Sequence, residues 1–483
     1  MLLTLIQKEI MHHILSVRFV ALLLMCVLLV PLTLFINYQN YRQNQIDYQE
    51  AVKRANAEAK ENPPDGIDPD KEVSKLFLKP TPLSVFANGL EEALPTYLGM
   101  TRNGVKQSST GLTQARLSFA LGNLDFLFVV STVFSLLALL FTFDTVAGER
   151  ETGTIRITLA NSLPRDRFLL GKMIGGYLVF VVPFLVSFLF GLLLLVWKGF
   201  PLGEPGIFPR VMTLTFASLL YIAVFFGIGT VISTYLDNAK TALIVAFTVW
   251  VFAVLIVPRI GFLGAKIIAP ARTEQSVYME KTLLRNDLLK EKQQKFNNKL
   301  FEIFGGGSFS VTENIKEKMD ELRAPLEEEY RQKFQDQVGK IDREYQRQQN
   351  RQERMGEMFS RITPTSSLIY LAMNLSQTGK LKRNTYFDTG NRYYDQLDEE
   401  YFKDVSDDAL AMATNLSDRM TARMNPFAES SNQETEKIST APDLIEPALS
   451  DTLRHSMLDT LLLCVFAAGL TTVAFLKFFR LDI

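Results

Sequence analysis

Six stretches of the chain are long, apolar and almost free of charge, and they limit the possible folds more than any other feature. They cover residues 19–37, 126–143, 173–197, 211–235, 241–258 and about 457–476. The first five contain no Asp, Glu, Lys or Arg, and the sixth contains only Asp459, near its start. A helix needs about 20 mostly apolar residues to cross the hydrocarbon core of a bilayer. The sequence therefore predicts an all-α membrane protein with six transmembrane helices.

The average composition hides this pattern. Mean hydropathy is only +0.09 and the formal net charge is −1, values typical of a soluble protein. However, 59 of the 103 Asp, Glu, Lys and Arg residues lie between Ala265 and Thr452. The near-neutral balance excludes a nucleic-acid binder that relies on a strong basic field. Cys26 and Cys464 both lie in apolar segments, which excludes a disulfide framework, and we expect no metal site.

The first apolar segment has one alternative interpretation, a cleavable signal peptide. The apolar part of a signal is about 7–15 residues long and ends at a small-residue site, whereas this run continues to Phe35 and Ile36. Ten Lys and Arg residues lie in the short connections on the side of the N-terminus, and only Lys198 and Arg210 lie in the short connection opposite. The positive-inside rule therefore places both termini in the cytoplasm. The two long loops then face outward.

These boundaries divide the chain into five parts. We expect a cytoplasmic N-terminus with the first transmembrane helix (1–37), a first extracytoplasmic loop domain (38–125), transmembrane helices two to five with a cytoplasmic segment at 144–172 (126–260), a large extracytoplasmic helical domain (261–455), and the sixth transmembrane helix with a cytoplasmic C-terminus (456–483).

The larger outer loop carries the spacing of a long helix. Apolar or aromatic residues recur every three or four positions from Ile315 to Tyr345, and a similar run lies at 284–304. The glycines at 305–307 separate them, which predicts an antiparallel helical hairpin. This hairpin is either a structural stalk or a docking surface for an extracytoplasmic partner.

The rest of both outer loops shows no sustained alternation of polar and apolar residues, so we predict mostly helix. Thr365 or Ser366 is expected to cap a short helix. An aromatic-rich helix is expected at 391–403.

The segment at 144–172 is short and densely charged, and Ile155, Ile157 and Leu159 are interleaved with the charges. Such a segment must stay at the membrane surface and can lie flat there as an amphipathic helix. It is either a solvated connector or a lever that touches a cytoplasmic partner.

The order of residues in this segment resembles the type-2 (export-type) permease subunits of ATP-binding-cassette transporters. The matching residues are Phe143, Asp144, Gly148, Glu149, Arg150, Glu151, Gly153, Thr154, Leu159, Ser162, Pro164, Arg167, Gly171 and Lys172. The N-terminal residues 7–10 and 16–19 also fit the family's pattern.

A branch of this family with large outer insertions, catalogued only as a domain of unknown function, is the most similar. Its outer motifs match Pro80 and Pro82 with Ser84, Gly89 with Glu91, Pro258 with Arg259, and a stretch at 364–379 that begins with Pro364. The resemblance thus covers nearly the whole chain, and the hairpin is its least specific part.

The resemblance implies that 144–172 holds a coupling helix that docks on an ATPase subunit. Glu149, Arg150 and Glu151 would make charge-assisted contacts with that subunit, and Gly153 would allow a tight turn. The implied ATPase contacts also include Asp144, Gly148, Thr154, Pro164 and Arg167.

The chain itself lacks a phosphate-binding loop. The only Gly-Lys pair in this segment is Gly171 with Lys172, and it is preceded by Asp166 in place of glycine and followed by Met173 in place of Ser or Thr. We therefore expect no catalytic residue and no cofactor in this chain, with ATP and Mg²⁺ bound by the partner ATPase.

The expected partners are two copies of an ABC ATPase, a second permease copy or paralogue, and membrane lipid, in the inner membrane of a bacterium. We expect coupling of ATP hydrolysis to export or extraction of a substrate. The alternative is ATP-driven mechanotransmission to an extracytoplasmic partner without a substrate crossing the membrane. A membrane scaffold without an ATPase would require the coupling motif to be a coincidence.

Overall fold

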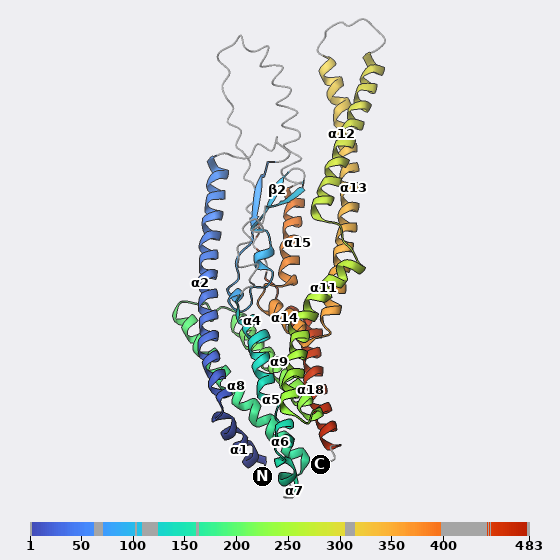
Figure 1. Ribbon diagram of the computed structural model, residues 1–483. Coiled ribbons are helices and arrows are strands. Elements are labelled where there is room, and N and C mark those ends of the chain that lie inside the picture. Colours follow the sequence, from blue (N-terminus) through green and yellow to red (C-terminus); the bar gives the residue numbers. More distant parts are fainter. Residues whose placement is uncertain are drawn as a thin grey trace. The chain divides into compact units, whose positions relative to one another are not determined.

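The computed structural model forms two compact units (Figure 1). It describes residues 2–61, 71–101, 104–108, 124–160, 164–304, 314–397, 442, 444 and 446–480. The bundle unit comprises Met1–Val254 and Pro364–Ile483, and the hairpin unit comprises Leu255–Thr363. The predicted glycine breaker at 305–307 lies outside the described residues.

Among the described residues, six helices are long and apolar enough to cross a membrane, which confirms the predicted all-α class. They are Val17–Lys60 within α2 (Val17–Glu61), Phe126–Glu151, α8 (Arg165–Trp197), α9 (Ile207–Tyr235), Ala239–Ile268, and α18 (Met457–Phe479). Each contains one of the six apolar segments of the sequence. Burial of those segments in lipid and against one another explains why they form helices.

The second of these spans contains a wide turn. It runs through α4 (Phe126–Phe128), the π-helix η3 (Val129–Phe134), α5 (Ser135–Thr142) and α6 (Ala147–Glu151). At the wide turn, the Ser131 carbonyl accepts the Ser135 hydroxyl at 2.6 Å and the Tyr221 hydroxyl of α9 at 2.8 Å. These two hydroxyls satisfy a backbone group that lies away from water.

Glycines bring the N-terminal helix α1 (Leu2–Ile14) close to α8. A Cβ added at Gly175 would lie 2.8 Å from the Cβ of Glu9, and one added at Gly171 would lie 3.1 Å from the Cβ of Leu5. Small residues let helix backbones approach closely in membranes. The close approach of the two helices at Gly171 and Gly175 therefore places Glu9 of α1 next to α8.

A small antiparallel sheet, which the sequence did not predict, lies in the first long loop. Its strands are β1 (Ser74–Phe77), β2 (Tyr97–Thr101) and β3 (Gly104–Gln107), in the order β1-β2-β3. Ser74 pairs with Met100, and Leu98 pairs with Gln107. Helix α15 (Lys380–Leu397) supplies Tyr386 and Tyr393 to the same buried core as Leu98. The sheet therefore joins two segments almost 300 residues apart in sequence.

Helix α14 (Pro364–Leu375) packs against α9 and α18 inside the bundle unit. Thr365 at its start lies 3.1 Å from the Tyr221 hydroxyl, and the Leu375 carbonyl at its end accepts from Arg210 at 3.3 Å. The helix is thus antiparallel to α9, and its first turn reaches the middle of α9. The prediction that Thr365 or Ser366 caps this helix is wrong, because the helix already begins at Pro364.

Helix α15 starts well before the aromatic-rich helix predicted at 391–403, and residues 398–403 lie outside the described part. A short helix, α17 (Leu449–His455), leads into α18.

The hairpin unit confirms the predicted antiparallel hairpin. Helices α12 (Glu274–Phe304) and α13 (Asn314–Ser360) are joined by ion pairs, Lys281 to Asp342 at 2.6 Å and Lys295 to Glu329 at 3.0 Å. Later residues of α12 pair with earlier residues of α13, so the two helices are antiparallel. The buried cluster between them is formed by Leu288, Leu326 and Tyr330, with Leu284, Phe296 and Phe334 packed against it. Apolar spacing therefore predicted the contact face correctly.

Candidate functional site

Before α8 begins, the segment at 144–172 folds into two short helices. Helix α6 is followed by α7 (Thr154–Ala160), and residues 161–163, which include Ser162, lie outside the described part. Gly153 makes the turn between α6 and α7 with φ +73°, and nothing lies within 4 Å of a Cβ added there. Left-handed φ is strongly disfavoured for most other residues, so the turn itself requires glycine.

The start of α6 is held by α9. The Ser233 hydroxyl oxygen of α9 accepts hydrogen bonds from the backbone N–H groups of Val146 at 2.9 Å and Ala147 at 3.0 Å. Ser233 is fully buried. The first N–H groups of a helix need external acceptors, and a buried side chain fixes them in place. Sequence analysis missed Ser233, because a serine inside an apolar span gives no signal of such a role.

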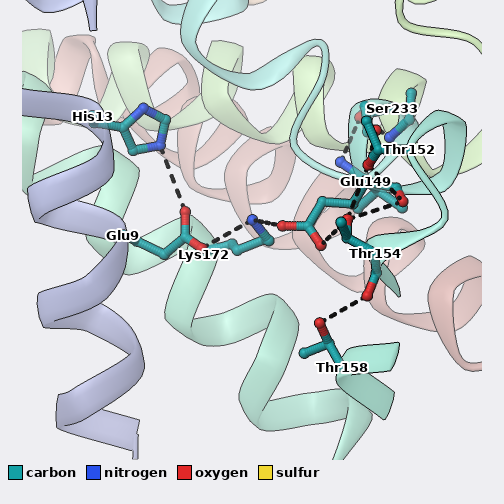
Figure 2. Close-up of polar contacts among 11 residues, drawn as sticks. Glu9, His13, Glu149, Thr152, Thr154, Thr158, Lys172 and Ser233 are labelled. Atoms are coloured by element: carbon teal, nitrogen blue, oxygen red, sulfur yellow. Dashed lines mark hydrogen bonds and ion pairs between the residues drawn. The ribbon is translucent and has the colours of Figure 1, made fainter. Parts of the chain in front are cut away.

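Lys172 joins three helices through ion pairs (Figure 2). Its Nζ lies 2.9 Å from Oε1 of Glu9 on α1 and 2.9 Å from Oε1 of Glu149 on α6. The Lys172 side chain is only 8% exposed. The other oxygen of Glu149 lies 3.1 Å from the Thr154 hydroxyl of α7. One buried ammonium therefore connects α1, α6 and α8, and Glu149 extends the connection to α7.

His13 lies at the edge of this cluster, with its Nε2 3.9 Å from a Glu9 oxygen (Figure 2). Burial lowers the pKa of His13, and the nearby Glu9 carboxylate opposes that effect without overcoming it. The imidazole is therefore neutral at neutral pH. Lys172 remains the cation that faces the two carboxylates.

A second connection links α2 to the start of the segment. The Arg18 guanidinium donates to both carboxylate oxygens of Asp144, at 2.9 and 2.8 Å, and also to the Leu140 carbonyl at 3.2 Å. Its Cζ lies 4.8 Å from the centre of the Phe143 ring. A two-pronged arginine–carboxylate pair fixes orientation as well as distance. Asp144 therefore holds the end of the second span against α2.

A third connection links α6 to the turn between α9 and α10 (Ala239–Trp250). Arg150 forms an ion pair with Asp237, and the Glu151 carboxylate accepts from the Ala239 backbone N–H at 3.0 Å. That N–H belongs to the first turn of α10, where a negative charge is favourable. The predicted residues Arg150 and Glu151 therefore make contacts within the chain.

One face of the region formed by α6, α7 and the start of α8 is exposed to solvent. Ile155 of α7 is buried with Phe168 and Phe478, whereas Arg156 and Ile157 next to it are exposed, Ile157 by 68%. Pro164 and Arg167, which the sequence also indicated, are exposed at the start of α8. The exposed side chains of α7 and the start of α8 therefore form a mixed charged and apolar surface. The helices that carry this surface are held in place by the ion pairs and hydrogen bonds described above.

The remaining predicted residue, Gly148, lies on α6. A Cβ added there would lie 3.4 Å from the Cβ of Asp144, an ordinary contact. Nothing in the structure at Gly148 requires glycine.

Most of the family residues predicted in the two long loops come together at a second place in the bundle unit. Gly89 adopts φ +53°, and a Cβ added there would lie 2.5 Å from the Thr378 hydroxyl oxygen. The Leu90 N–H donates to the Thr378 carbonyl at 2.8 Å. Thr81, between Pro80 and Pro82, donates to Gln377 at 3.0 Å. The motifs near 80–91 and 364–379 therefore form one contact, whereas Arg259 lies exposed on α11 (Val257–Ile268) in the hairpin unit.

Two buried acids belong to this contact. Glu91 accepts from the Thr81 N–H at 3.2 Å and lies 3.6 Å from Lys382, and burial raises the pKa of Glu91. Asp125 accepts from the Phe128 N–H at 2.7 Å and the Asn88 N–H at 3.0 Å. Burial raises the pKa of Asp125 to about 6. These acids fix backbone turns, since each accepts from main-chain groups.

Within the described ranges, no three His, Cys, Asp or Glu side chains come together as a metal ion would require.

Comparison with known proteins identifies the family. Residues 3–483 match the profile of the family described as ABC-2 family transporter protein. The chain is also similar to the probable ABC transporter permease protein NosY of Pseudomonas aeruginosa, with 31% identity over 150 residues. That match covers 28% of this chain and 54% of the relative, so it spans only about half the relative's length. Because the profile covers nearly every residue, the chain belongs to the ABC-2 family of transporter proteins, as a multi-pass membrane protein.

Proposed function

We propose that this chain is the transmembrane permease subunit of an ABC transporter and couples ATP hydrolysis by a separate ATPase subunit to export or extraction of a substrate. The observation that carries the proposal is the attachment of α6 and α7 to the rest of the bundle. Glu149 reaches α1 and α8 through Lys172, Asp144 reaches α2 through Arg18, and Arg150 reaches Asp237 after α9. Family membership supports the same function.

The proposed mechanism is a rigid-body lever. A partner that presses on the exposed Arg156 and Ile157 would move α6 and α7 together, because Thr154 and Glu149 join them. The three ion-pair connections would then pass the displacement to α1, α2, α8 and the start of α10. Packed elements transmit such motions as units. Under this proposal Glu149 and Arg150 position the lever, and the exposed side chains contact the ATPase.

The proposal includes a membrane orientation and an assembly. Both termini and the 144–172 segment would lie in the cytoplasm of a bacterium, so that the segment meets the ATPase at the inner membrane. Two ATPase copies and a second permease copy or paralogue would complete the transporter, and ATP with Mg²⁺ would bind only to the ATPase subunits.

Co-purification tests this function. The full chain, expressed with its ATPase, should recover that ATPase and stimulate its ATP hydrolysis. Ile157→Asp should lower both, because it places an uncompensated charge on the docking surface, whereas Lys299→Glu on the hairpin should not. Recovery of no ATPase with the wild-type chain would end this proposal.

A second candidate function is mechanotransmission to an extracytoplasmic partner. The observation that favours it is the length of the hairpin, with 31 residues in α12 and 47 in α13 held in register by ion pairs. Removing 285–338 and joining the two helices with a short glycine linker would shorten the hairpin and leave its base intact. Unchanged substrate flux in that variant would argue for transport and against mechanotransmission.

A further inference from the structure

The base of the hairpin unit carries an apolar surface with basic residues. Helix α11 packs on the end of α13 through small residues, since a Cβ added at Gly261 would lie 2.8 Å from the Ser360 backbone nitrogen. Gln352, which precedes Ser360 in α13, donates its side-chain amide to the Ala269 carbonyl at 3.0 Å. The opposite side of α11 is exposed and includes Leu263 and Ile267, the latter 81% exposed. One side of α11 is therefore covered by protein and the other is not.

The end of α13 carries a separate exposed surface on the side turned away from α11, since Gln352, Gly356 and Ser360 face α11. Met358 is 73% exposed and Ile362, just after the helix, is 67% exposed. Arg351 and Arg354 lie one to two turns before Met358 and are also exposed. Apolar residues therefore cluster toward Ile362, and basic residues follow along the helix.

The charge on the exposed side of α11 is one-sided. Arg259 and Lys266 are exposed, and neither of them forms a hydrogen bond or ion pair with another described residue. Helix α11 contains no Asp or Glu, whereas the end of α13 carries Glu353 and Glu357 among its basic residues. The exposed side of α11 therefore offers basic groups to an anion from outside the chain.

The position of α11 along its span identifies the anion. Ala239–Ile268 is one candidate span of 30 residues. At 1.5 Å per residue its length is about 45 Å, which equals the bilayer with both headgroup layers. The apolar run predicted at 241–258 fills the hydrocarbon core, so α11 lies at headgroup depth. Apolar side chains flanked by Lys and Arg suit the boundary between acyl chains and anionic headgroups.

We propose that the exposed side of α11 forms a binding surface for anionic phospholipid. Leu263 and Ile267 would contact acyl chains, and Arg259 and Lys266 would contact phosphates. A second copy of this chain is the other candidate occupant. A two-fold interface places the same patch against itself, so these basic residues would meet like charges. This proposal does not depend on the ATPase or on the transported substrate.

Lipid titration tests the proposal with the full chain in detergent. Phosphatidylglycerol or phosphatidylcholine is added, and bound lipid is counted by native mass spectrometry. We expect selective binding of phosphatidylglycerol to the wild type. The variant Arg259→Gln, Lys266→Gln should bind phosphatidylglycerol about thirtyfold more weakly, since each basic group contributes separately to anionic attraction.

The matched control removes two exposed charges elsewhere on the hairpin, with Lys290→Gln and Lys299→Gln, and should retain wild-type binding. Equal phosphatidylglycerol binding by the wild type and the first variant would overturn the proposal. So would a loss of dimer mass in that variant without any lipid dependence, because it would assign the surface to a second copy. The unfolding temperature of each variant distinguishes loss of binding from loss of folding.

Discussion

The Arg18 guanidinium and the Asp144 carboxylate form a two-pronged ion pair although 126 positions separate them in the chain. Their side chains are 39% and 28% exposed, so the pair is partly shielded from water. It joins the start of α2 to the end of the second span. The geometry explains why Asp144 matters to the fold before any partner docks.

Replacing Arg18 tests this pair. Arg18→Ala should lower the free energy of unfolding by roughly 1.5–3 kcal/mol, the usual range for hydrogen bonds to a charged group. Arg18→Lys keeps the charge but loses the fork, so it should recover only part of the loss. The measurement is thermal unfolding in detergent. If Arg18→Lys matches the wild type, the two-pronged geometry contributes nothing.

Lys172 gives a sharper prediction, because its removal leaves Glu9 and Glu149 facing each other without a cation. Lys172→Met should cost roughly 3–5 kcal/mol of stability, as expected for a broken buried ion pair. The triple variant Glu9→Gln, Lys172→Met, Glu149→Gln removes all three charges and should regain most of that stability. Its stimulation of the ATPase should remain low, because α1, α6 and α8 are no longer tied by charge. Full stimulation in the triple variant would show that the ties do not carry the coupling.

Gly153 separates backbone strain from side-chain contact. Because nothing lies near a Cβ there, Gly153→Val should suffer only from φ +73°, at about 1–2 kcal/mol. Gly153→Asn should be milder, since asparagine tolerates the left-handed region. Gly264→Ala in α11, with open space and no positive φ, is the control and should not lower stability. An unfolding temperature that rises from Gly153→Val to Gly153→Asn to the wild type would support a strained left-handed turn at this position. Equal unfolding temperatures would refute it.

Asp125 predicts a pH dependence. Its folded-state pKa is raised from 3.8 to about 6 by burial, so the folded chain holds this proton more tightly than the unfolded chain. The resulting stability is fully present below about pH 4 and is lost as pH rises through 6, by on the order of 3 kcal/mol. Asp125→Asn removes this titration. The stability of the wild type relative to Asp125→Asn, measured by unfolding from pH 4 to 7, should fall as pH rises. A constant difference would contradict the assignment.

The spans and the hairpin could be predicted because their signals are local. An apolar run such as 211–235 indicates by itself a preference for lipid. The spacing of apolar residues from Ile315 to Tyr345 indicates by itself which face of that helix is buried. The short strands β1 to β3 gave no such signal, since four or five residues are too few for alternation to stand out. The start of α14 was misplaced because Thr365 and Ser366 resemble caps, whereas Pro364 already begins the helix.

The candidate site was predicted only as a segment. Family resemblance indicated Glu149 and Lys172, but their meeting with Glu9 depends on the packing of α1 against Gly171 and Gly175. Ser233 holds the start of α6 from 86 or more positions away, which no spacing rule anticipates. Arg150 and Glu151 were expected to contact the ATPase, and in this structure they bind Asp237 and Ala239.

The π turn at Val129–Phe134 has a consequence for the direction in which the lever points. Each residue of an α-helix advances the chain by about 100° around its axis, and a π turn holds one residue more than an α turn. The cap at Asp125 and the ion pair at Asp144 lie on opposite sides of this turn. Deleting one residue from the π turn would leave an ordinary α turn and keep Asp144 directed at Arg18, whereas deleting one residue from the α-helical part that follows would swing Asp144 roughly 100° away. The number of residues in this span therefore determines the direction of Asp144 as well as the thickness of membrane that the span can cross.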